Sequence, residues 1–329
     1  MKYFLTGATG FIGLELTKHL LLEGETIHAL VRSPDNPILP DHQNLVLFKG
    51  DVSDQKSIDR AMEGCDYVFH LAGYTKLWSK EKYLPYKINV EGTREILESA
   101  LKNKIKRVVF TSTAGTLKPS ETDEEIDENS PAPEFYFTEY EQTKREAEKL
   151  CLSFVLNGLD VVIVNPSRVY GPGQLNKSNS VTLLIKKYID GKWRFIPGNG
   201  KNIGNYVYIE NIVEGHMLAL KKGKRGERYI LGGTNASFNE FFGLLAEITE
   251  RHYRLFNLPL WLMILFSKIM GVLAAAFGIE PLITTPWVKR YNQNRVLTSK
   301  KAKTNLGYSI TPLSEGVKKT KVWLESKNS

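Results

Sequence analysis

The feature that most constrains this chain is a glycine-rich turn between a short apolar strand and a long helix pattern. Tyr3 to Leu5 form the expected strand, and Gly7, Gly10 and Gly13 follow it with the spacing G-x-x-G-x-x-G. The first glycine permits a tight turn, the second lets backbone approach a ligand, and the third lets the helix pack closely on the sheet. Because backbone N–H groups and the helix dipole point toward such a turn, the sequence predicts a pyrophosphate site there.

Strand patterns alternate with helix patterns through the first half of the chain. The expected strands lie near residues 26–31, 45–49, 66–70, 107–111 and 160–164. The expected helices lie near residues 11–23, 54–63, 80–103, 138–157 and 210–222. Continuous apolar strands that alternate with helices are typical of a parallel sheet covered on both faces. The sequence therefore predicts an α/β fold, a Rossmann-type doubly wound parallel sheet with a smaller C-terminal substrate region.

Cysteine content and charge exclude several other classes of protein. The two cysteines, Cys65 and Cys151, lie far apart and no metal-ligand spacing is present, so we expect a reducing compartment and no metal site. The net charge of +8 is diffuse and no basic-aromatic motif accompanies it, so we expect no nucleic-acid partner. The first expected strand begins near residue 2 and leaves no room for a signal peptide, which predicts a cytoplasmic protein.

Tyr140 and Lys144 lie four residues apart on an expected helix, so their side chains share one face. A nearby ammonium group lowers the pKa of a tyrosine from its usual value of about 10. Such a tyrosine can exchange a proton with an alcohol or carbonyl oxygen. Two adjacent hydroxyls, Ser112 and Thr113, follow the strand at 107–111, and either would hydrogen-bond the same reacting oxygen. They point to opposite faces if the strand continues, so they are alternatives.

Further motifs follow the ends of the expected strands, where ligands bind in folds of this kind. They are Gly50-Asp51, His70-Leu71-Ala72-Gly73, Asn89-Val90-Glu91-Gly92-Thr93, Thr111-Ser112-Thr113-Ala114, Val169-Tyr170-Gly171-Pro172-Gly173, Tyr206-Val207-Tyr208-Ile209-Glu210-Asn211-Ile212 and the run from Gly226 to Gly233. In this order, together with the glycine turn and Tyr140-x-x-x-Lys144, they resemble the extended short-chain dehydrogenase/reductase (NAD-dependent epimerase/dehydratase) superfamily. The Leu77-Trp78 loop and Ile163 to Ser167 resemble its dihydroflavonol 4-reductase-like group, which includes 3β-hydroxysteroid dehydrogenases.

The resemblance implies an NAD(P)-dependent enzyme and a division of the chain. Residues 1–170, with 206–235 returning to them, would form the NAD(P)-binding Rossmann domain. Residues 171–205 and 236–329 would form the substrate-binding region. The cofactor-binding residues that the resemblance implies are Gly7, Thr9, Gly10, Phe11, Ile12, Gly13, Arg32, Asp51, Val52, Leu71, Ala72, Gly73, Tyr140, Lys144 and Pro166.

Two of these residues bear on how the cofactor's adenosine half is recognised. Asp51 would accept a hydrogen bond from the adenine amino group; its alternative is an aspartate that only caps a helix or turn. Arg32 follows the second strand, where an acid usually binds the ribose of NAD and an arginine suits the 2′-phosphate of NADP. We therefore expect NADP, with NAD as the alternative if Arg32 only stacks on adenine.

The resemblance also assigns roles at the reacting centre. The catalytic hydroxyl is the one immediately before Ala114, which favours Thr113 over Ser112, and Lys144 also bonds to the nicotinamide ribose. Thr113, Tyr140 and Lys144 are thus the expected catalytic residues. His70 is expected to be structural, and Asn89 to hold the catalytic strand in place.

Two classes of reaction fit this set of residues. The first is an NADP-dependent oxidoreductase that interconverts a carbonyl and an alcohol on a small apolar substrate. The second is a nucleotide-sugar epimerase with a tightly held NAD(P), for which Arg168 and Arg194 would serve the nucleotide. A non-enzymatic cofactor-binding protein is disfavoured by the intact Thr113, Tyr140 and Lys144.

The apolar segment 258–279 complicates the prediction of location. Its 22 residues would reach across a bilayer core, but Lys268 lies in the middle and disfavours a span. Contact with a membrane surface, a lid over a lipid-like substrate, and burial in the protein or in a homodimer are the alternatives left open.

Overall fold

A seven-stranded parallel sheet is the centre of the computed structural model, which describes residues 1–121 and 124–327. Its strands are β1 (Lys2–Thr6), β2 (Thr26–Val31), β3 (Leu45–Lys49), β4 (Tyr67–His70), β5 (Arg107–Thr111), β6 (Val161–Pro166) and β10 (Arg228–Leu231). They lie in the order β10-β6-β5-β4-β1-β2-β3. The order reverses between β1 and β4, which is where ligands bind in doubly wound sheets. The predicted Rossmann-type fold is confirmed.

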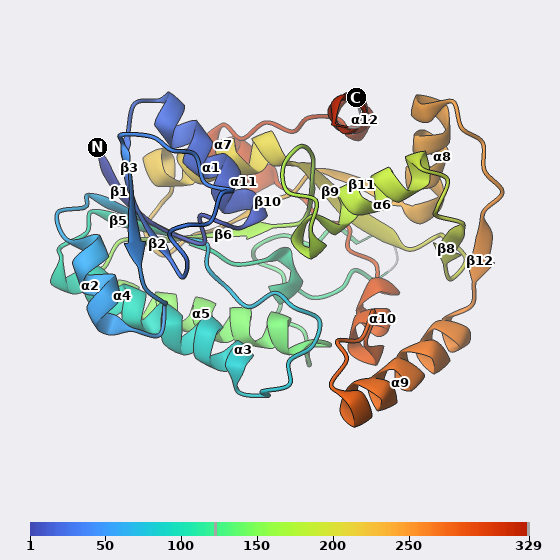
Figure 1. Cartoon of the computed structure of the whole chain (residues 1–329), viewed down its shortest axis with the longest axis horizontal. Helices are drawn as coiled ribbons and strands as arrows, with labels where there is room; N and C mark the ends of the chain where they lie inside the picture. The colour runs from blue at the N-terminus through green and yellow to red at the C-terminus, as the bar shows by residue number, and fades with distance from the viewer. Residues whose placement is uncertain (122–123, 328–329) are drawn as a thin grey trace.

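Helices cover both faces of this sheet (Figure 1). One face packs against α1 (Phe11–Leu22), α7 (Ile209–Lys222) and α11 (Lys300–Leu306). The other packs against α2 (Gln55–Met62), α4 (Gly92–Lys102) and α5 (Glu139–Leu156). Side chains of β1 alternate between the two cores, with Tyr3 and Leu5 in one and Phe4 in the other. The sheet is therefore buried on both sides, which is why its strands read as continuous apolar runs.

The expected helix at 80–103 begins later and changes its winding. It starts with α3 (Leu84–Tyr86), continues as a π-helix, η1 (Lys87–Glu91), and ends as α4. Pro85 lies in the first turn, where its missing N–H costs nothing, so the helix does not extend back to residue 80. The π-turn turns Asn89 toward the active-site side, and such turns occur often at functional sites.

The remaining elements form a second region beside the sheet. A three-stranded sheet has the order β11 (Thr234–Ser237), β9 (Ile203–Tyr208), β7 (Arg168–Tyr170). It packs with α6 (Ser180–Ile189), α8 (Phe238–Thr249) and α12 (Leu313–Ser326) around a separate apolar core. A short 3-10 turn, η3 (Lys177–Asn179), and a strand pair, β8 (Phe195–Pro197) with β12 (Phe256–Leu258), complete it; another 3-10 turn, η2 (Ala114–Thr116), follows β5 of the parallel sheet.

The apolar segment forms helix α9 (Leu260–Phe277), which lies between β12 and α10 (Thr285–Tyr291) at the edge of the molecule (Figure 1). By length and composition α9 is one helix that could cross a membrane. Only Ser267 and Ala274 within it are buried. The alternative that this segment is buried within its own chain is therefore wrong. The side of α9 that carries these two small residues packs on α10, and its large side chains point outward.

The glycine turn supplies a stability test with a matched control. A Cβ at Gly13 would lie 2.1 Å from the Gly7 carbonyl oxygen, whereas one at Gly243, exposed within α8, would meet no atom within 4 Å. We expect Gly13→Ala to lower the free energy of unfolding by roughly 1–3 kcal/mol through overpacking. Gly243→Ala should raise it by about 0.5–1 kcal/mol because alanine favours the helix. Urea unfolding measures both, and an unchanged or more stable Gly13→Ala would contradict the close packing.

Candidate active site

The turn after β1 has the geometry of an anion cradle. Gly7 adopts φ +78°, and a Cβ there would lie 2.7 Å from the Ala72 nitrogen, so glycine is required for conformation and for space. Gly10 is the N-cap of α1 and has no side-chain cap, which leaves the first N–H groups of α1 for a ligand. A Cβ at Gly10 would meet only the Gly7 carbonyl oxygen. This cradle fits the pyrophosphate of a dinucleotide.

A chain of hydrogen bonds fixes the ends of β1 and β4 beside this cradle. The Ala72 N–H donates to Thr6 Oγ1 (3.1 Å), and Thr6 Oγ1 lies 2.7 Å from His70 Nδ1. His70 Nε2 lies 3.0 Å from Thr93 Oγ1, which donates to the Asn89 carbonyl oxygen (2.7 Å). Since the Thr93 proton is used there, Nε2 donates to Thr93 Oγ1, and the Thr6 hydroxyl, which accepts from Ala72, has its own proton for Nδ1. The neutral ring protonated at Nε2 satisfies both contacts. Burial lowers the pKa of His70 to about 3.

Asn89 links this chain to the helix that carries Tyr140. Its Oδ1 accepts from the Tyr74 N–H (2.6 Å), and its Nδ2 donates to the Tyr74 carbonyl oxygen (3.2 Å) and to Thr143 Oγ1 (2.9 Å). Thr143 lies on α5 between Tyr140 and Lys144. Asn89 therefore holds the loop after β4 against α5, rather than holding the strand that ends at Thr111.

The structure brings Thr113, Tyr140 and Lys144 together at the carboxyl end of β5. Thr113 lies beside Tyr140 and acts on the pKa of its hydroxyl, and Thr113 Oγ1 accepts from the Gly115 N–H (3.1 Å). Lys144 Nζ donates to the Thr111 carbonyl oxygen (2.8 Å) and would lie 3.3 Å from a Cβ at Gly73. A reacting oxygen beside Tyr140 and Thr113 would thus have a proton donor and a second hydrogen-bonding hydroxyl.

The electrostatics of Tyr140 differ from the sequence-based expectation. Burial raises the pKa of Tyr140, and the Arg290 guanidinium and the Thr113 hydrogen bond lower it in part. Lys144 is not among the charges that shift the pKa of Tyr140, and burial lowers its own pKa to about 8. Here the Lys144 amine donates to the Thr111 carbonyl oxygen and burial raises the pKa of Tyr140, so the tuning of Tyr140 by Lys144 stays a prediction.

Sequence reasoning missed an arginine pair beside Tyr140. Glu141 is buried and accepts from Arg290 Nε (2.5 Å) and from an Arg295 guanidinium nitrogen (3.2 Å). Arg295 also donates to the Leu117 carbonyl oxygen (2.6 Å), which ties the loop after Thr113 to the C-terminal region. The signal visible in the sequence is Glu141 three residues after Thr138, a pattern of helix N-termini. Nothing local to it points to partners about 150 residues away.

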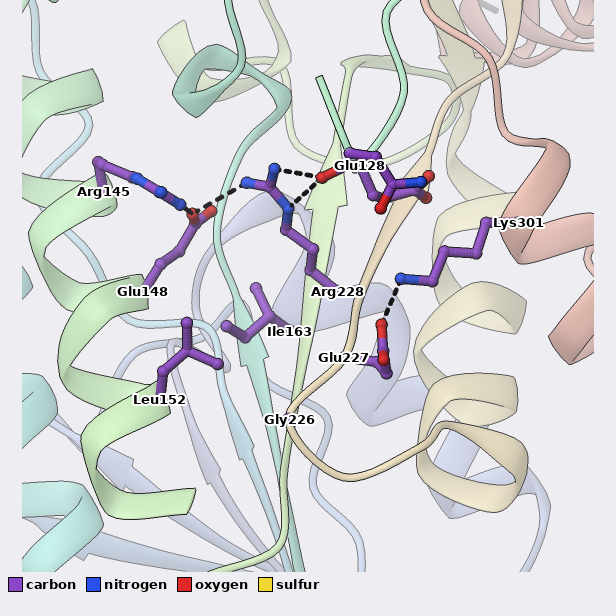
Figure 2. A pocket seen from close by; sticks show the side chains of 10 residues that line it. Glu128, Arg145, Glu148, Leu152, Ile163, Gly226, Glu227, Arg228 and Lys301 are labelled. Carbon is purple, nitrogen blue, oxygen red and sulfur yellow. Dashed lines mark hydrogen bonds and ion pairs between the residues drawn. The ribbon is translucent and has the colours of Figure 1, made fainter. Parts of the chain in front are cut away.

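Ser112 faces away from Tyr140 and toward a charged cavity. Its hydroxyl donates to Glu148 Oε1 (2.6 Å). Figure 2 shows Arg145 and Arg228 converging on Glu148 in that cavity, which has a volume of about 230 Å³. Lys301 pairs with Glu227 there at 2.5 Å. Because these acids and bases neutralise one another behind the Thr113 loop, the cavity is a structural feature and not the candidate active site.

The residues expected to hold the cofactor lie at the carboxyl ends of the strands. Arg32 is exposed directly after β2. Asp51 Oδ1 accepts from the Ser53 N–H (3.0 Å) and hydroxyl (2.8 Å), and Asp54 rather than Asp51 caps α2. Pro166 ends β6. The other expected residues lie in the loops after β1, β3 and β4 or in the first turn of α1; the loop residues are Thr9, Val52, Leu71, Ala72 and Gly73, and the helix residues are Phe11 and Ile12.

The chain matches known proteins over nearly its whole length. The sequence pattern of the NAD dependent epimerase/dehydratase family matches residues 3–232. A Synechocystis sp. protein named "Putative dihydroflavonol 4-reductase" is 32% identical over 98% of this chain and 94% of its own length. Sterol demethylase protein B of Methylococcus capsulatus is 31% identical over 76% of this chain and 75% of its own. The fold matches UDP-glucose 4-epimerase of Thermotoga maritima with a TM-score of 0.83, at 23% identity and full coverage of both chains.

The buried histidines predict how stability depends on pH. Burial lowers the pKa of His70 to about 3 and that of His216 to about 4, against about 6.5 in an unfolded chain. Between these values the unfolded chain binds protons that the folded chain does not, so folding is favoured above pH 6.5 and weakens as pH falls. We expect the free energy of unfolding in urea to decrease from pH 7.5 to pH 5. His252→Gln, at an exposed histidine, should leave the decrease unchanged. Equal stability at both pH values would contradict the neutral, buried state.

Proposed function

Because this chain belongs to the NAD dependent epimerase/dehydratase family, whose members and relatives are NAD(P)-dependent enzymes, we propose that it is an NADP-dependent oxidoreductase. It interconverts a carbonyl and an alcohol on a small apolar molecule. The observation that carries this proposal is the placement of Thr113 beside Tyr140 at the carboxyl end of β5, with Lys144 one helical turn further along α5. Its coarser part, a Rossmann fold in an enzyme family that uses NAD(P), is established by the matches above.

In this proposal each of the three side chains acts on the substrate oxygen or on the cofactor. Tyr140 passes its hydroxyl proton to a carbonyl oxygen on reduction and takes it back on oxidation. Thr113 hydrogen-bonds the same oxygen and stabilises the charge that develops on it. Lys144 holds the nicotinamide ribose from beside Gly73, where its amine is already anchored on the Thr111 carbonyl oxygen. The nicotinamide, when bound, supplies or accepts the hydride.

The cofactor residues act through the geometry of the strand ends. We assign the pyrophosphate to the turn of Gly7, Gly10 and Gly13, the adenine amino group to Asp51, and the 2′-phosphate to Arg32. Ser167 follows Pro166 with a buried hydroxyl that has no partner among the described residues, and it suits the polar carboxamide of a nicotinamide. Residues 1–170 and 206–235 are assigned to cofactor binding, and 171–205 and 236–329 to the substrate.

Two observations favour an apolar substrate. The sterol in the name of the Methylococcus relative is such a molecule. The apolar helix α9 packs on α10, whose Arg290 reaches Glu141 beside Tyr140 and whose Trp287 ring lies 4.7 Å from the Arg290 guanidinium. An aromatic side chain near the reacting centre suits a flat apolar ring better than a sugar.

One observation favours the second candidate, a nucleotide-sugar epimerase with tightly held NAD(P). Arg168 and Arg290 lie 5.6 and 5.9 Å from the centre of the Tyr291 ring. Two guanidinium groups near one aromatic ring would suit a diphosphate and a base. The purified protein, incubated either with NADPH and apolar ketones or with NAD+ or NADP+ and UDP-sugars, distinguishes the two. Net loss of NADPH absorbance supports the reductase, whereas sugar conversion without net NADPH loss supports the epimerase.

Tyr140→Phe tests the proton donor. We expect this variant to lose roughly 10²–10⁴-fold in kcat, the usual scale for general acid–base catalysis, while its Kd for the cofactor changes little. The measurement is steady-state NADPH oxidation together with cofactor titration by fluorescence. An unchanged kcat would remove Tyr140 from the mechanism.

Thr113→Ala and Ser112→Ala are the matched pair for this test. Thr113 lies beside Tyr140, whereas the Ser112 hydroxyl donates to Glu148, so only Thr113→Ala should share the kinetic loss. Ser112→Ala is expected to act mainly on stability, since it removes a partner of a buried carboxylate. A larger loss of kcat in Ser112→Ala would show that the assignment of the hydroxyls is reversed.

Arg32→Asp tests the choice of cofactor. The unaltered protein should bind NADPH more tightly than NADH because an arginine–phosphate contact is charge-assisted and often bidentate. The variant should lose or reverse that preference, since an aspartate repels the 2′-phosphate and accepts from a 2′-hydroxyl. Isothermal titration with both cofactors measures it, and a preference for NADH before mutation would refute the NADP assignment.

A further inference from the structure

In helix α9 the small side chains face the protein and the large apolar side chains face outward, which is the reverse of an ordinary amphipathic helix. Positions seven apart lie on one line of an α-helix, and Ser267 and Ala274 mark the line that faces the protein. Ser267 Oγ lies 2.8 Å from Thr285 Oγ1 on α10. The large exposed side chains of α9 point away from that line; they are Trp261, Leu262, Leu265, Phe266, Ile269, Val272, Leu273 and Phe277. A contiguous apolar face of this size marks an interaction surface.

The attachment of α9 makes it lie along a surface rather than cross a bilayer. Its N-terminal end follows β12, which pairs with β8, and its C-terminal end leads into α10, which Arg290 ties to Glu141. Both ends are thus fixed to the same body of protein (Figure 1). An 18-residue helix is about 27 Å long, so a span would separate these two ends by nearly the thickness of the bilayer core.

The charges around α9 match an anionic surface. Residues 251–290 contain five basic residues and one acidic residue, and of the basic residues Arg290 is paired with Glu141. The acidic one, Glu280, is paired with Lys177 at 2.7 Å. Arg251 and Arg254 are exposed before the helix and Lys289 after it. Lys268 is exposed at the edge of the apolar face, where its long side chain can reach a headgroup while its stem stays in an apolar layer.

We propose that α9 docks this protein on an anionic lipid surface, lying in the interface with its outward face among the acyl chains. Trp261, near the start of the helix, is the kind of aromatic residue that anchors at the boundary between headgroups and hydrocarbon. The basic residues on both sides of the helix bind the lipid phosphates and carboxylates. A second copy of the chain is the other occupant to be tested; the excess of like charge around both faces disfavours that pairing.

Flotation of the full chain with vesicles tests this proposal. We expect binding to vesicles that contain phosphatidylserine, with weaker binding to pure phosphatidylcholine and at high salt. Trp261→Lys combined with Phe266→Lys should reduce the bound fraction at least tenfold. Leu22→Lys combined with Leu156→Lys is the matched control, because both leucines are strongly exposed elsewhere on the surface and should not affect binding. Arg251→Glu combined with Arg254→Glu should lower the partition constant for anionic vesicles. The expected loss is roughly fivefold or more for each arginine that lies near the membrane surface.

Three results would overturn the proposal. The first is no flotation of the unaltered protein with either kind of vesicle. The second is equal flotation of the α9 variant and the control. The third is a dimer in light scattering that Trp261→Lys with Phe266→Lys dissociates while no vesicle binding is seen, which would assign the face to a second copy. Circular dichroism and thermal unfolding of the variants check that the fold is retained, as the exposure of the altered side chains leads us to expect.

Discussion

The interaction on which the rest of the site depends is the neutral, doubly hydrogen-bonded His70 between Thr6 and Thr93. Through these two hydroxyls the end of β1, the loop after β4 and the π-turn at Asn89 are held in one arrangement. Asn89 then carries that arrangement to α5 through Thr143. The glycine turn and the reacting centre come from separate parts of the sequence. This series of buried hydrogen bonds fixes the distance between them. It is buried, so each member must have its partner, and the neutral form of the imidazole is the one that provides both a donor and an acceptor.

Much of the fold could be predicted from the sequence because parallel strands buried on both faces have an unmistakable pattern. The strands at 26–31, 45–49 and 107–111 occur within the expected limits, since each is an apolar run bounded by polar loops. The prediction of a helix at 80–103 is wrong at its start, because Pro85 lies in the first helical turn. It is also wrong in the winding, because a π-turn has no local sequence signature. Of the alternatives for 258–279, burial within its own chain is wrong, because hydropathy gives composition and not the direction in which side chains point.

At the site, the sequence identified side chains of known chemistry but not those that act on them from a distance. Tyr140, Thr113 and Lys144 were visible through their spacing along the chain. Arg290 and Arg295 were not, because their common partner Glu141 precedes them by about 150 residues, and α10 and the segment after it reach Glu141 only in the folded chain. A buried carboxylate with two arginines leaves a positive charge beside a buried phenol, which no helical spacing of a lysine would have indicated.

The inward face of α9 has a consequence for how this protein can change over generations. Because the helix touches the fold mainly through small side chains, replacing its large outward residues removes little packing from the body that holds Tyr140. Substitutions on the outward face of α9 therefore have little effect on the free energy of unfolding. The composition of this face can change with the surface or partner that it contacts. Substitutions in this one helix can consequently change the surface on which the protein docks. The glycine turn and the buried hydrogen bonds of His70 remain sterically constrained.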